Sequence, residues 1–449
     1  MRKHFIYSLM NGLQYLSPCQ SLPVFGGLWI LILRTCINQL PFYSAHRKRF
    51  PSLKKDGKIG DLFAALGGLT MSTVVGWDKV KGPVETAYTL PPSCYFSPDV
   101  YASERKRIFS GGWVSFGRAE DLGNAGEYFA SMVADTPLVA VRGDDGEIRV
   151  FANTCRHRGM QLLSEGRGCV RQIACPFHGW GYALDGALTA APRMKSSIDF
   201  DKSDFGLIQI SSAVREGFIF VNLDGAAGYV DDWLSGFSDL HQPWNLEALR
   251  TASRREFTVQ CNWKLFLEVF NEYYHLKKVH PGTFGSLYQD PDPPEPVTGC
   301  FVSQFGEHVK KGSVGVLAKD HNELPLLPGL TGRLSNGTRY SWIYPNLSFA
   351  ASRDAVWMLE VTPIGPAETQ VRMRLMFDAD VMQSRGFAEK LSIYEERMQI
   401  GMAEDIVVLE AQQIGVSSQF AQQGRFCPEL EPSVHAFQKW YAKRMSAVS

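Results

Sequence analysis

Hydrophobic and polar positions alternate in short runs along the middle of the chain, which indicates a β-rich region. Residues 136–155 are apolar on both sides of the hairpin signal GDDGE, so we expect two antiparallel strands joined by a tight turn. Residues 97–116 predict a short helix followed by a strand. We therefore expect an antiparallel β-domain over about residues 113–224.

Beyond residue 225 the pattern becomes a mixture of helical and strand periodicities. Residues 263–274 and 388–413 predict helices, whereas residues 339–351 and 355–364 predict strands. No βαβ repeat or Gly-rich phosphate loop accompanies them, so the expected fold class is α+β. The chain is predicted to comprise an extension, a β-domain with a helical lead-in and an α+β domain, over residues 1–85, 86–225 and 226–449.

Composition excludes several classes of protein. The 449 residues are 45% hydrophobic and 12% aromatic, which suits two or three packed domains rather than a disordered chain. Residues 56–449 carry 38 basic and 46 acidic side chains without a basic stripe, which argues against nucleic acid as a partner. Nine cysteines without regular spacing do not suit a secreted disulfide framework, so we expect a reducing compartment, the cytoplasm.

The first 70 residues admit three interpretations. Residues 5–33 are uncharged and long enough for a membrane anchor, although their strongest apolar run has only eight residues. The basic, acid-free character of residues 1–55 also suits an organelle transit segment. The third interpretation, which we favour, places the natural start at Met71. Membrane or organelle association is expected only if the leader belongs to the mature protein.

Two cysteines and two histidines in the β-domain form the first candidate metal site. Cys155 and His157 make C-x-H, and Cys175 and His178 make C-x-x-H. Such a set suits a tetrahedral zinc ion or a [2Fe-2S] cluster in which two histidines replace two cysteines on one iron. Each half is a tight glycine-containing loop with one Cys and one His, a pattern that resembles Rieske proteins. The resemblance implies that Cys155 and Cys175 bind one iron and that His157 and His178 bind the other. Cys169 matches no ligand position and is expected to be an ordinary buried thiol.

The stretch NEYYHLKKVHPG, residues 271–282, supplies a second candidate site. Glu272 and His275 are i,i+3 neighbours on a helix, but His280 lies five positions beyond His275, about 140° around the helix axis. Both imidazoles reach one metal only through a π-bulge or a helix that ends between them. Pro281 suits such an ending. Two histidines with one carboxylate form the facial triad of non-haem Fe(II) oxygenases.

Residues 262–282 resemble the mononuclear-iron signature of the Rieske non-haem iron oxygenases, whose oxygenase component combines both kinds of metal site. The matching positions are Asn262, Trp263, Lys264, Glu268, Glu272, Tyr274, His275 and His280. Val269 departs from the family, which usually has Asn after this Glu. The resemblance covers about residues 88–449 and implies a Rieske domain followed by a helix-grip (START/Bet v 1-like) catalytic domain.

The third iron ligand is expected from the helical segment GMAEDIVVLEAQQIGVSSQF. Periodicity places Asp405 on one face with Met398 and Met402, where a carboxylate is costly unless it binds something. A charge on the helix surface is the alternative interpretation. The family's C-terminal pattern, ED followed by Q-x-G, implies Asp405 rather than Glu404 or Glu410.

The same resemblance implies a role for each remaining residue of the second site. His275 and His280 would bind iron, and Glu272 would occupy the bridging carboxylate position, where many members have Asp. Because electrons pass between neighbouring subunits of a trimer in this family, Glu272 would link His178 of one subunit to His275 of the next. Such a carboxylate also fixes the orientation and tautomer of an imidazole.

Together these implications predict the oxygenase component of a Rieske oxygenase, of the alpha-subunit type. A separate reductase, directly or through a ferredoxin, would supply electrons from NAD(P)H, since the chain has no flavin or nicotinamide motif. The [2Fe-2S] cluster would relay them to Fe(II), which activates O2 to hydroxylate or N-demethylate a small organic substrate, as a monooxygenase or a dioxygenase.

Several details favour the choline, carnitine and betaine branch of the family: Glu at the bridge, the NEYYH spacing and the ending Q-x-G-x-S followed by FQKWYA. The alternative within the family is an aromatic-ring-hydroxylating dioxygenase alpha subunit. The alternative of another class is a non-catalytic Rieske electron carrier or a zinc-binding module.

Overall fold

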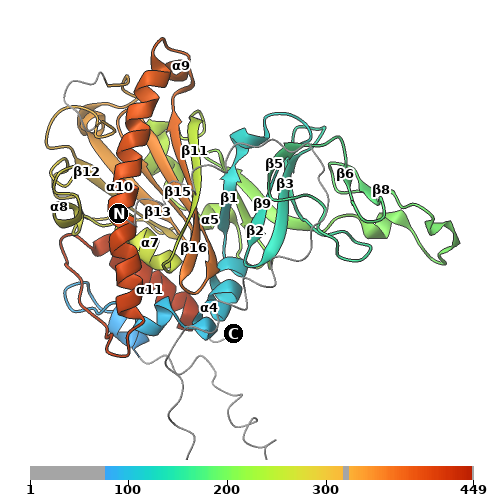
Figure 1. The fold of residues 1–449 in the computed structure, drawn as a ribbon, viewed down its shortest axis with the longest axis horizontal. Helices are drawn as coiled ribbons and strands as arrows, with labels where there is room; N and C mark the ends of the chain where they lie inside the picture. Colours follow the sequence, from blue (N-terminus) through green and yellow to red (C-terminus); the bar gives the residue numbers. More distant parts are fainter. Residues whose placement is uncertain (1–75, 317–322, 447–449) are drawn as a thin grey trace, which may run out of the picture. The chain divides into compact units, whose positions relative to one another are not determined.

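The computed structural model describes residues 76–316 and 323–446, and these form three antiparallel sheets (Figure 1). A seven-stranded sheet has the order β1-β10-β9-β4-β3-β2-β5, a six-stranded sheet has the order β11-β16-β15-β14-β13-β12, and β6-β7-β8 form a small third sheet. The seven-stranded sheet and the small sheet come from the first half of the described chain. The long helices pack against the six-stranded sheet. The predicted α+β class is confirmed.

Most strand bounds agree with the patterns of the sequence, but the strand predicted over residues 339–351 is wrong, because a turn at residues 344–346 divides it into two antiparallel strands. The seven-stranded sheet consists of β1 (Val114–Arg118), β2 (Glu127–Val133), β3 (Thr136–Arg142), β4 (Ile148–Ala152), β5 (Gly166–Cys169), β9 (Gln209–Arg215) and β10 (Phe218–Asn222). The small sheet consists of β6 (Ile173–Ala174), β7 (Gly181–Tyr182) and β8 (Leu188–Ala190). The six-stranded sheet consists of β11 (Arg250–Val259), β12 (Phe301–Glu307), β13 (Gly337–Ile343), β14 (Leu347–Ala351), β15 (Val356–Gly365) and β16 (Glu368–Phe377).

The α-helices of the described chain lie before, between and after the strands of the two large sheets. They are α4 (Pro98–Glu104), α5 (Val230–Trp233), α6 (Phe237–His241), α7 (Trp263–Phe270), α8 (Leu276–Val279), α9 (Ala379–Met382), α10 (Phe387–Val416) and α11 (Pro432–Ser446). In Figure 1, α10 runs across one face of the six-stranded sheet, with α7 and α11 beside it. In the described ranges no helix combines the length and the apolar character needed to cross a membrane. The leader up to residue 75 lies outside these ranges.

Helix α7 is shorter than its periodicity predicts, because local side chains end it. The Asn262 side chain accepts a hydrogen bond from Lys264 N at 3.0 Å and caps its start. At the other end, the Asn271 side chain donates to Leu267 O at 2.7 Å, which satisfies one of the carbonyl groups left free by the last turn. The predicted helix over residues 263–274 is therefore wrong beyond Phe270.

Helix α10 presents one buried face to the rest of the protein. Its buried residues recur every three or four positions: Tyr394, Arg397, Met398, Gly401, Met402, Asp405, Leu409 and Gln413. Gly401 is needed within this helix, because a Cβ atom there would lie 2.9 Å from the ring of Phe284. The predicted face shared by Asp405, Met398 and Met402 is confirmed.

A buried ionic cluster fixes α7 against the helices at both ends of the described chain. Lys264 Nζ lies 2.5 Å from Glu104 Oε1, and both side chains are fully buried. Trp263 and Tyr441 donate further hydrogen bonds to the same carboxylate. Because a buried charge is stable only when it is paired and hydrogen-bonded, these contacts hold α4, α7 and α11 in one arrangement. This arrangement positions the segment that follows α7.

Candidate metal centres

Two similar loops hold the four residues of the first candidate site. Cys155 N donates to Met160 O at 2.8 Å, and Cys175 N donates to Trp180 O at 2.7 Å, so each loop closes over the same number of residues. Within each loop a glycine four positions after the cysteine donates back to the cysteine carbonyl. Gly159 and Gly179 have φ values of 74° and 71°, a left-handed conformation that favours glycine. The matching backbone explains why each motif ends in glycine.

The side chains of these loops fit a Rieske [2Fe-2S] cluster. The thiols of Cys155 and Cys175 are both 97% buried, whereas His157 is half-buried and His178 is exposed. The two imidazole rings lie edge to face, with centroids 4.8 Å apart and an interplanar angle of 75°. Among the described residues, the buried Nδ1 of His157 has no hydrogen-bond partner, which leaves it available to a metal. The two cysteines and two histidines therefore fit a Rieske [2Fe-2S] cluster, and their role as its ligands stays a prediction.

A tyrosine that the sequence analysis did not single out supports the thiol side of this site. The hydroxyl of Tyr182 lies 3.3 Å from Cys155 Sγ and accepts a hydrogen bond from Arg156 N at 3.0 Å. Hydrogen bonds to cluster sulfur atoms are one of the means by which proteins set a reduction potential.

Cys169, in contrast, is exposed on β5, so its predicted burial is wrong. A short edge strand of alternating accessibility places its side chain outward.

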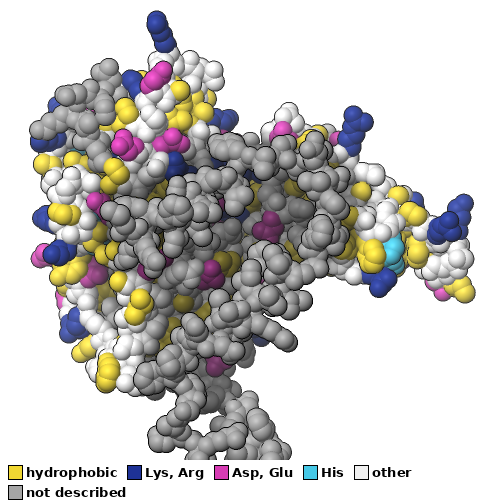
Figure 2. All heavy atoms as spheres, viewed as in Figure 1, with side chains coloured by type: hydrophobic (Ala, Val, Ile, Leu, Met, Phe, Trp, Pro, Cys, Tyr) yellow, Lys and Arg dark blue, Asp and Glu magenta, His cyan; other side chains and the backbone are white. Residues whose placement is uncertain are grey.

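The outer side of this site lies at the surface. Figure 2 shows a histidine there beside hydrophobic side chains, and in Figure 1 the strands β6 and β8 mark this projecting part. Phe177, whose ring lies 3.8 Å from that of His178, is 55% exposed. An exposed imidazole beside an exposed aromatic ring gives an accessible point for contact with another protein surface.

The second candidate site forms where α8 faces α10. His275 precedes α8, and His280 follows it, so one short helical turn separates the two imidazoles. The expected ending of a helix between the two histidines is seen in α8, which ends at Val279, whereas α7 already ends at Phe270, before both of them. Glu272 contributes by accepting hydrogen bonds from the backbone N–H groups of Tyr274 and His275, as an N-terminal cap does.

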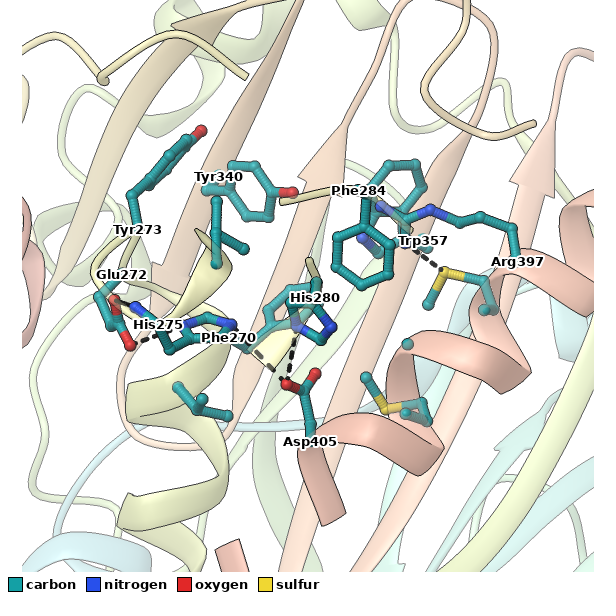
Figure 3. A pocket seen from close by; sticks show the side chains of 15 residues that line it. Phe270, Glu272, Tyr273, His275, His280, Phe284, Tyr340, Trp357, Arg397 and Asp405 are labelled. Atoms are coloured by element: carbon teal, nitrogen blue, oxygen red, sulfur yellow. Dashed lines mark hydrogen bonds and ion pairs between the residues drawn. The ribbon is translucent and has the colours of Figure 1, made fainter. Parts of the chain in front are cut away.

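His275, His280 and Asp405 converge on one point (Figure 3). Asp405 Oδ1 lies 3.0 Å from Nε2 of His280 and 3.7 Å from Nε2 of His275, and all three ligand atoms lie within 4.8 Å of one another. His280 Nε2 and Asp405 Oδ1 are buried, and in the described part of the chain neither has a hydrogen-bond partner. Two histidines and one carboxylate in this state fit a mononuclear iron ion with open positions. Their assignment as ligands stays a prediction.

Each of these imidazoles has a carboxylate on its other nitrogen. Nδ1 of His275 lies 2.6 Å from Glu272 Oε1, and Nδ1 of His280 lies 2.7 Å from Glu404 Oε2. Such contacts fix the ring orientation and direct Nε2 toward the metal. Burial lowers the pKa of His275, but Glu272 and Asp405 outweigh it and raise the pKa above its ordinary value.

From the sequence alone, Glu404 is only an alternative to Asp405 as a metal ligand. In the structure Glu404 also accepts a hydrogen bond from Thr283 Oγ1 at 3.0 Å, so it faces the backbone segment that carries His280. Adjacent residues of a helix point about 100° apart, and an ED pair can therefore place one carboxylate on a ligand position and the other behind a histidine. Glu410, the other alternative, accepts a hydrogen bond from Gln260 N instead.

Aromatic side chains surround a small cavity of about 40 Å³ beside His275, His280 and Asp405 (Figure 3). Its lining includes Phe270, Tyr273, Phe284, Tyr340, Trp357 and Arg397. The ring of Phe284 lies 3.9 Å from that of His280, so the cavity is in direct contact with the candidate ligands. A mostly apolar cavity with a few polar groups is typical of a small-molecule site.

A second cavity, of about 370 Å³, is also lined by Glu272 and His275. It is lined by three carboxylates, those of Glu268, Glu272 and Glu431. Burial raises the pKa of Glu268 to about 7, although hydrogen bonds from Gln438 and Tyr95 and the charge of Lys264 act in the opposite direction. Burial also raises the pKa of Glu431.

We expect the raised pKa of Glu268 to make the protein less stable as the pH rises from about 4.5 to about 7. The native state holds a proton on this carboxyl in that range, whereas the unfolded chain releases it, so unfolding is favoured by deprotonation. A Glu268→Gln variant removes this loss, which amounts to up to about 3 kcal/mol. Between pH 5 and pH 8, the thermal unfolding midpoint of the variant should therefore rise relative to that of the unsubstituted protein as the pH increases. Parallel profiles for the two proteins would contradict the prediction.

Comparison with protein families gives two matches that follow the two candidate sites. A model described as the Rieske [2Fe-2S] domain matches residues 112–210, and a model described as the ring hydroxylating alpha subunit (catalytic domain) matches residues 246–447. The first range contains all four residues of the two loops. The second contains His275, His280 and Asp405.

Relatives with described activities cover most of the chain. The glycine betaine monooxygenase oxygenase subunit of Chromohalobacter salexigens is 29% identical over 80% of this chain and 86% of its own length. The chloroplastic choline monooxygenase of Arabidopsis thaliana is 28% identical over 79% of this chain and 82% of its own length.

Two solved structures are similar to this chain over most of its length. A quaternary ammonium Rieske monooxygenase, described in connection with carnitine oxidation and inter-subunit electron transfer, is 25% identical with a TM-score of 0.71, covering 82% of this chain and 98% of that one. Naphthalene 1,2-dioxygenase from a Rhodococcus species has the same TM-score at 20% identity, covering 85% of this chain and all of that one, and so shares the fold.

Proposed function

The chain belongs to the Rieske non-haem iron oxygenases, as the subunit that carries both a Rieske [2Fe-2S] domain and the ring-hydroxylating alpha-subunit catalytic domain, and on this premise we propose that it oxidises a small quaternary ammonium compound. One oxygen atom of O2 would enter a C–H bond next to the quaternary nitrogen, and the other would leave as water. Two electrons from a reductase and two protons complete the reaction. The observation that carries the proposal is the aromatic cavity in direct contact with His280.

Oxygenases of this family use a Rieske cluster and a mononuclear iron, with O2 as co-substrate. When bound, the cluster supplies single electrons and the iron supplies the position at which O2 is activated. We assign Cys155, His157, Cys175 and His178 to the cluster and His275, His280 and Asp405 to the iron. Glu272 and Glu404 each accept a hydrogen bond from the Nδ1–H of a histidine, which keeps both Nε2 atoms free for metal.

Aromatic rings suit a substrate with a quaternary ammonium group. A cation without N–H groups is attracted to the faces of aromatic rings by their quadrupole, and this attraction is stronger in a desolvated cavity. Phe270, Tyr273 and Tyr340 form such a set, with Tyr340 5.7 Å from Phe270 and 5.6 Å from Tyr273 between ring centroids. The relatives named for glycine betaine and choline support the same substrate class.

We propose that electrons pass between subunits, the process named for a related quaternary ammonium Rieske monooxygenase. We propose a homotrimer in which Glu272 meets His178 of the partner subunit. The 370 Å³ cavity is lined by Glu272, a hydrogen-bond acceptor. The exposed Phe177 and His178 of the partner subunit would supply an aromatic ring and an imidazole N–H donor to it. A carboxylate that accepts a hydrogen bond from an imidazole on each side would make a short hydrogen-bonded route between two histidines.

Oxygenase components of this family receive electrons from a reductase. We propose a separate NAD(P)H-dependent reductase, directly or through a ferredoxin, as the partner of this chain. The cytoplasm is the proposed compartment, because none of the seven cysteines within the described ranges forms a disulfide.

The test is substrate-dependent oxygen consumption by the iron-loaded protein with an excess of a compatible reductase and NADH. Glycine betaine, carnitine, choline and naphthalene would be compared, with the oxidised carbon product and O2 uptake measured in equal amounts. We expect turnover of at least one quaternary ammonium compound and none of naphthalene. Turnover of naphthalene alone would replace the proposal by aromatic-ring hydroxylation, and reduction of the cluster without turnover of any organic compound would indicate an electron carrier.

A further inference from the structure

Arg397 brings a positive charge into the aromatic cavity. It lies on the buried face of α10, two turns before Asp405, and its side chain is 5% exposed. The guanidinium carbon lies 4.3 Å from the ring centroid of Phe284 and 4.7 Å from that of Trp357, so the group stacks between two walls of the cavity (Figure 3). A charge in this position must affect which molecules can enter.

The hydrogen bonds of Arg397 leave its charge uncompensated. Nε donates to Val314 O at 3.1 Å, Nη2 donates to the hydroxyl of Tyr288 at 3.3 Å, and Nη1 meets only the sulfur of Met398 at 3.4 Å. Carbonyl, hydroxyl and thioether groups carry no net charge, and a guanidinium has five N–H donors to satisfy.

The other buried arginines of the described chain differ from Arg397 in this respect. Each of them lies within ion-pair distance of a carboxylate: Arg118 at 3.7 Å from Glu120, Arg339 at 3.0 Å from Glu295, Arg372 at 2.7 Å from Glu360, and Arg374 at 2.6 Å from Asp121. Within residues 76–316 and 323–446, Arg397 has no such partner. Because an unpaired buried charge is costly, a bound anion is the expected counter-ion.

The position of Arg397 suits one end of a short molecule whose other end reaches the iron ligands. Phe284 lies between them, 3.9 Å from the His280 ring and 4.3 Å from the guanidinium. These two contacts limit the separation of guanidinium and imidazole to about 8 Å. A small zwitterion spans that distance, with its anionic end at Arg397 and its cationic end toward Asp405 and the rings of Phe270 and Tyr340.

We propose that Arg397 binds the carboxylate of the substrate, so that this oxygenase acts on carboxylated quaternary ammonium compounds and discriminates against choline. This inference rests on the proposed function and narrows its substrate class. The guanidinium would repel an ammonium group placed beside it, which directs that group toward the iron. Choline has no anionic group, and its binding would leave Arg397 unpaired beside a second cation.

The test is anaerobic calorimetric titration of the iron-loaded protein with glycine betaine, carnitine and choline, which measures binding without turnover. We expect at least one carboxylated ligand to bind on the order of 100-fold more tightly than choline, as a charge-assisted hydrogen-bonded pair provides. Arg397→Met should remove this advantage. Arg397→Lys should recover part of it, because lysine keeps the charge but loses the planar fork. Iron and sulfide contents of both variants should match those of the unsubstituted protein.

The matched control is Arg339→Met. Arg339 is also buried and stacked on aromatic rings, Trp244 and Phe305, but it does not line the cavity. Its replacement should leave the preference for carboxylated ligands unchanged. Equal binding of choline and glycine betaine, or an unchanged preference in Arg397→Met, would overturn the inference. Oxidation of choline alone would also overturn it while leaving the proposed function intact. Failure of all three ligands to bind would remove the proposed function and the inference together.

Discussion

Replacing His275 with alanine is expected to abolish turnover while leaving the Rieske cluster intact. The substitution removes one of three groups whose ligand atoms lie within 4.8 Å of one another, and two remaining ligands do not hold Fe(II) in a facial site. The cluster loops come from a different part of the chain, residues 155–160 and 175–180, and do not contact His275 through any hydrogen bond of the described residues. Iron should therefore fall from about three to about two per chain, with about two acid-labile sulfides and the visible spectrum unchanged.

The control for this measurement is His435→Ala. His435 is also a buried histidine, but its Nε2 contacts Val80 O at 3.1 Å and belongs to neither candidate metal site. This variant should retain three irons and turnover. Two irons in both the unsubstituted protein and His275→Ala, after iron reconstitution, would mean that the second site binds no metal and that the chain only carries electrons. Bound zinc without iron or sulfide would indicate the zinc-binding alternative.

The parts of the protein that could be predicted are those in which nearby residues determine the local structure. The hairpin around GDDGE forms β3 and β4, because the turn residues and the flanking alternation lie within one short segment. The two metal loops likewise depend on a cysteine and the glycine four positions later. The requirement that the helix end before His280 follows from the angle between side chains on a helix, and needs no tertiary contact.

The features that could not be predicted depend on contacts between distant residues. Glu404 and His280 are 124 positions apart, so no local pattern places that carboxylate behind the imidazole. Arg397 stacks on Phe284, a residue distant from it in the sequence that also packs against Gly401 on the same helix. The end of α7 at Phe270 depends on the capping contacts of Asn271 and Glu272, which compete with a helical periodicity that continues beyond them.

Glu272→Gln is expected to slow electron transfer from the Rieske cluster while retaining the iron. The carboxylate contacts His275 Nδ1 at 2.6 Å on one side, and it lines the 370 Å³ cavity on the other. Glutamine has the same shape and can still accept a hydrogen bond from His275, but it lacks the charge and has only one acceptor oxygen. In the proposed trimer the glutamine side chain could not accept hydrogen bonds from two imidazoles equally. We expect re-oxidation of the reduced cluster by substrate and O2, followed by stopped-flow absorption, to slow about 10- to 100-fold.

Glu404→Gln is the matched control, because it changes the equivalent contact of the other histidine. Glu404 contacts His280 Nδ1 at 2.7 Å, but it does not line the cavity beside Glu272. Its loss should weaken iron binding about 10- to 100-fold, as removal of such a carboxylate typically does. Once iron is saturated, cluster re-oxidation should proceed at nearly the unsubstituted rate. Equal slowing in both variants would mean that Glu272 acts only by orienting His275, and normal re-oxidation in Glu272→Gln would exclude it from the route between subunits.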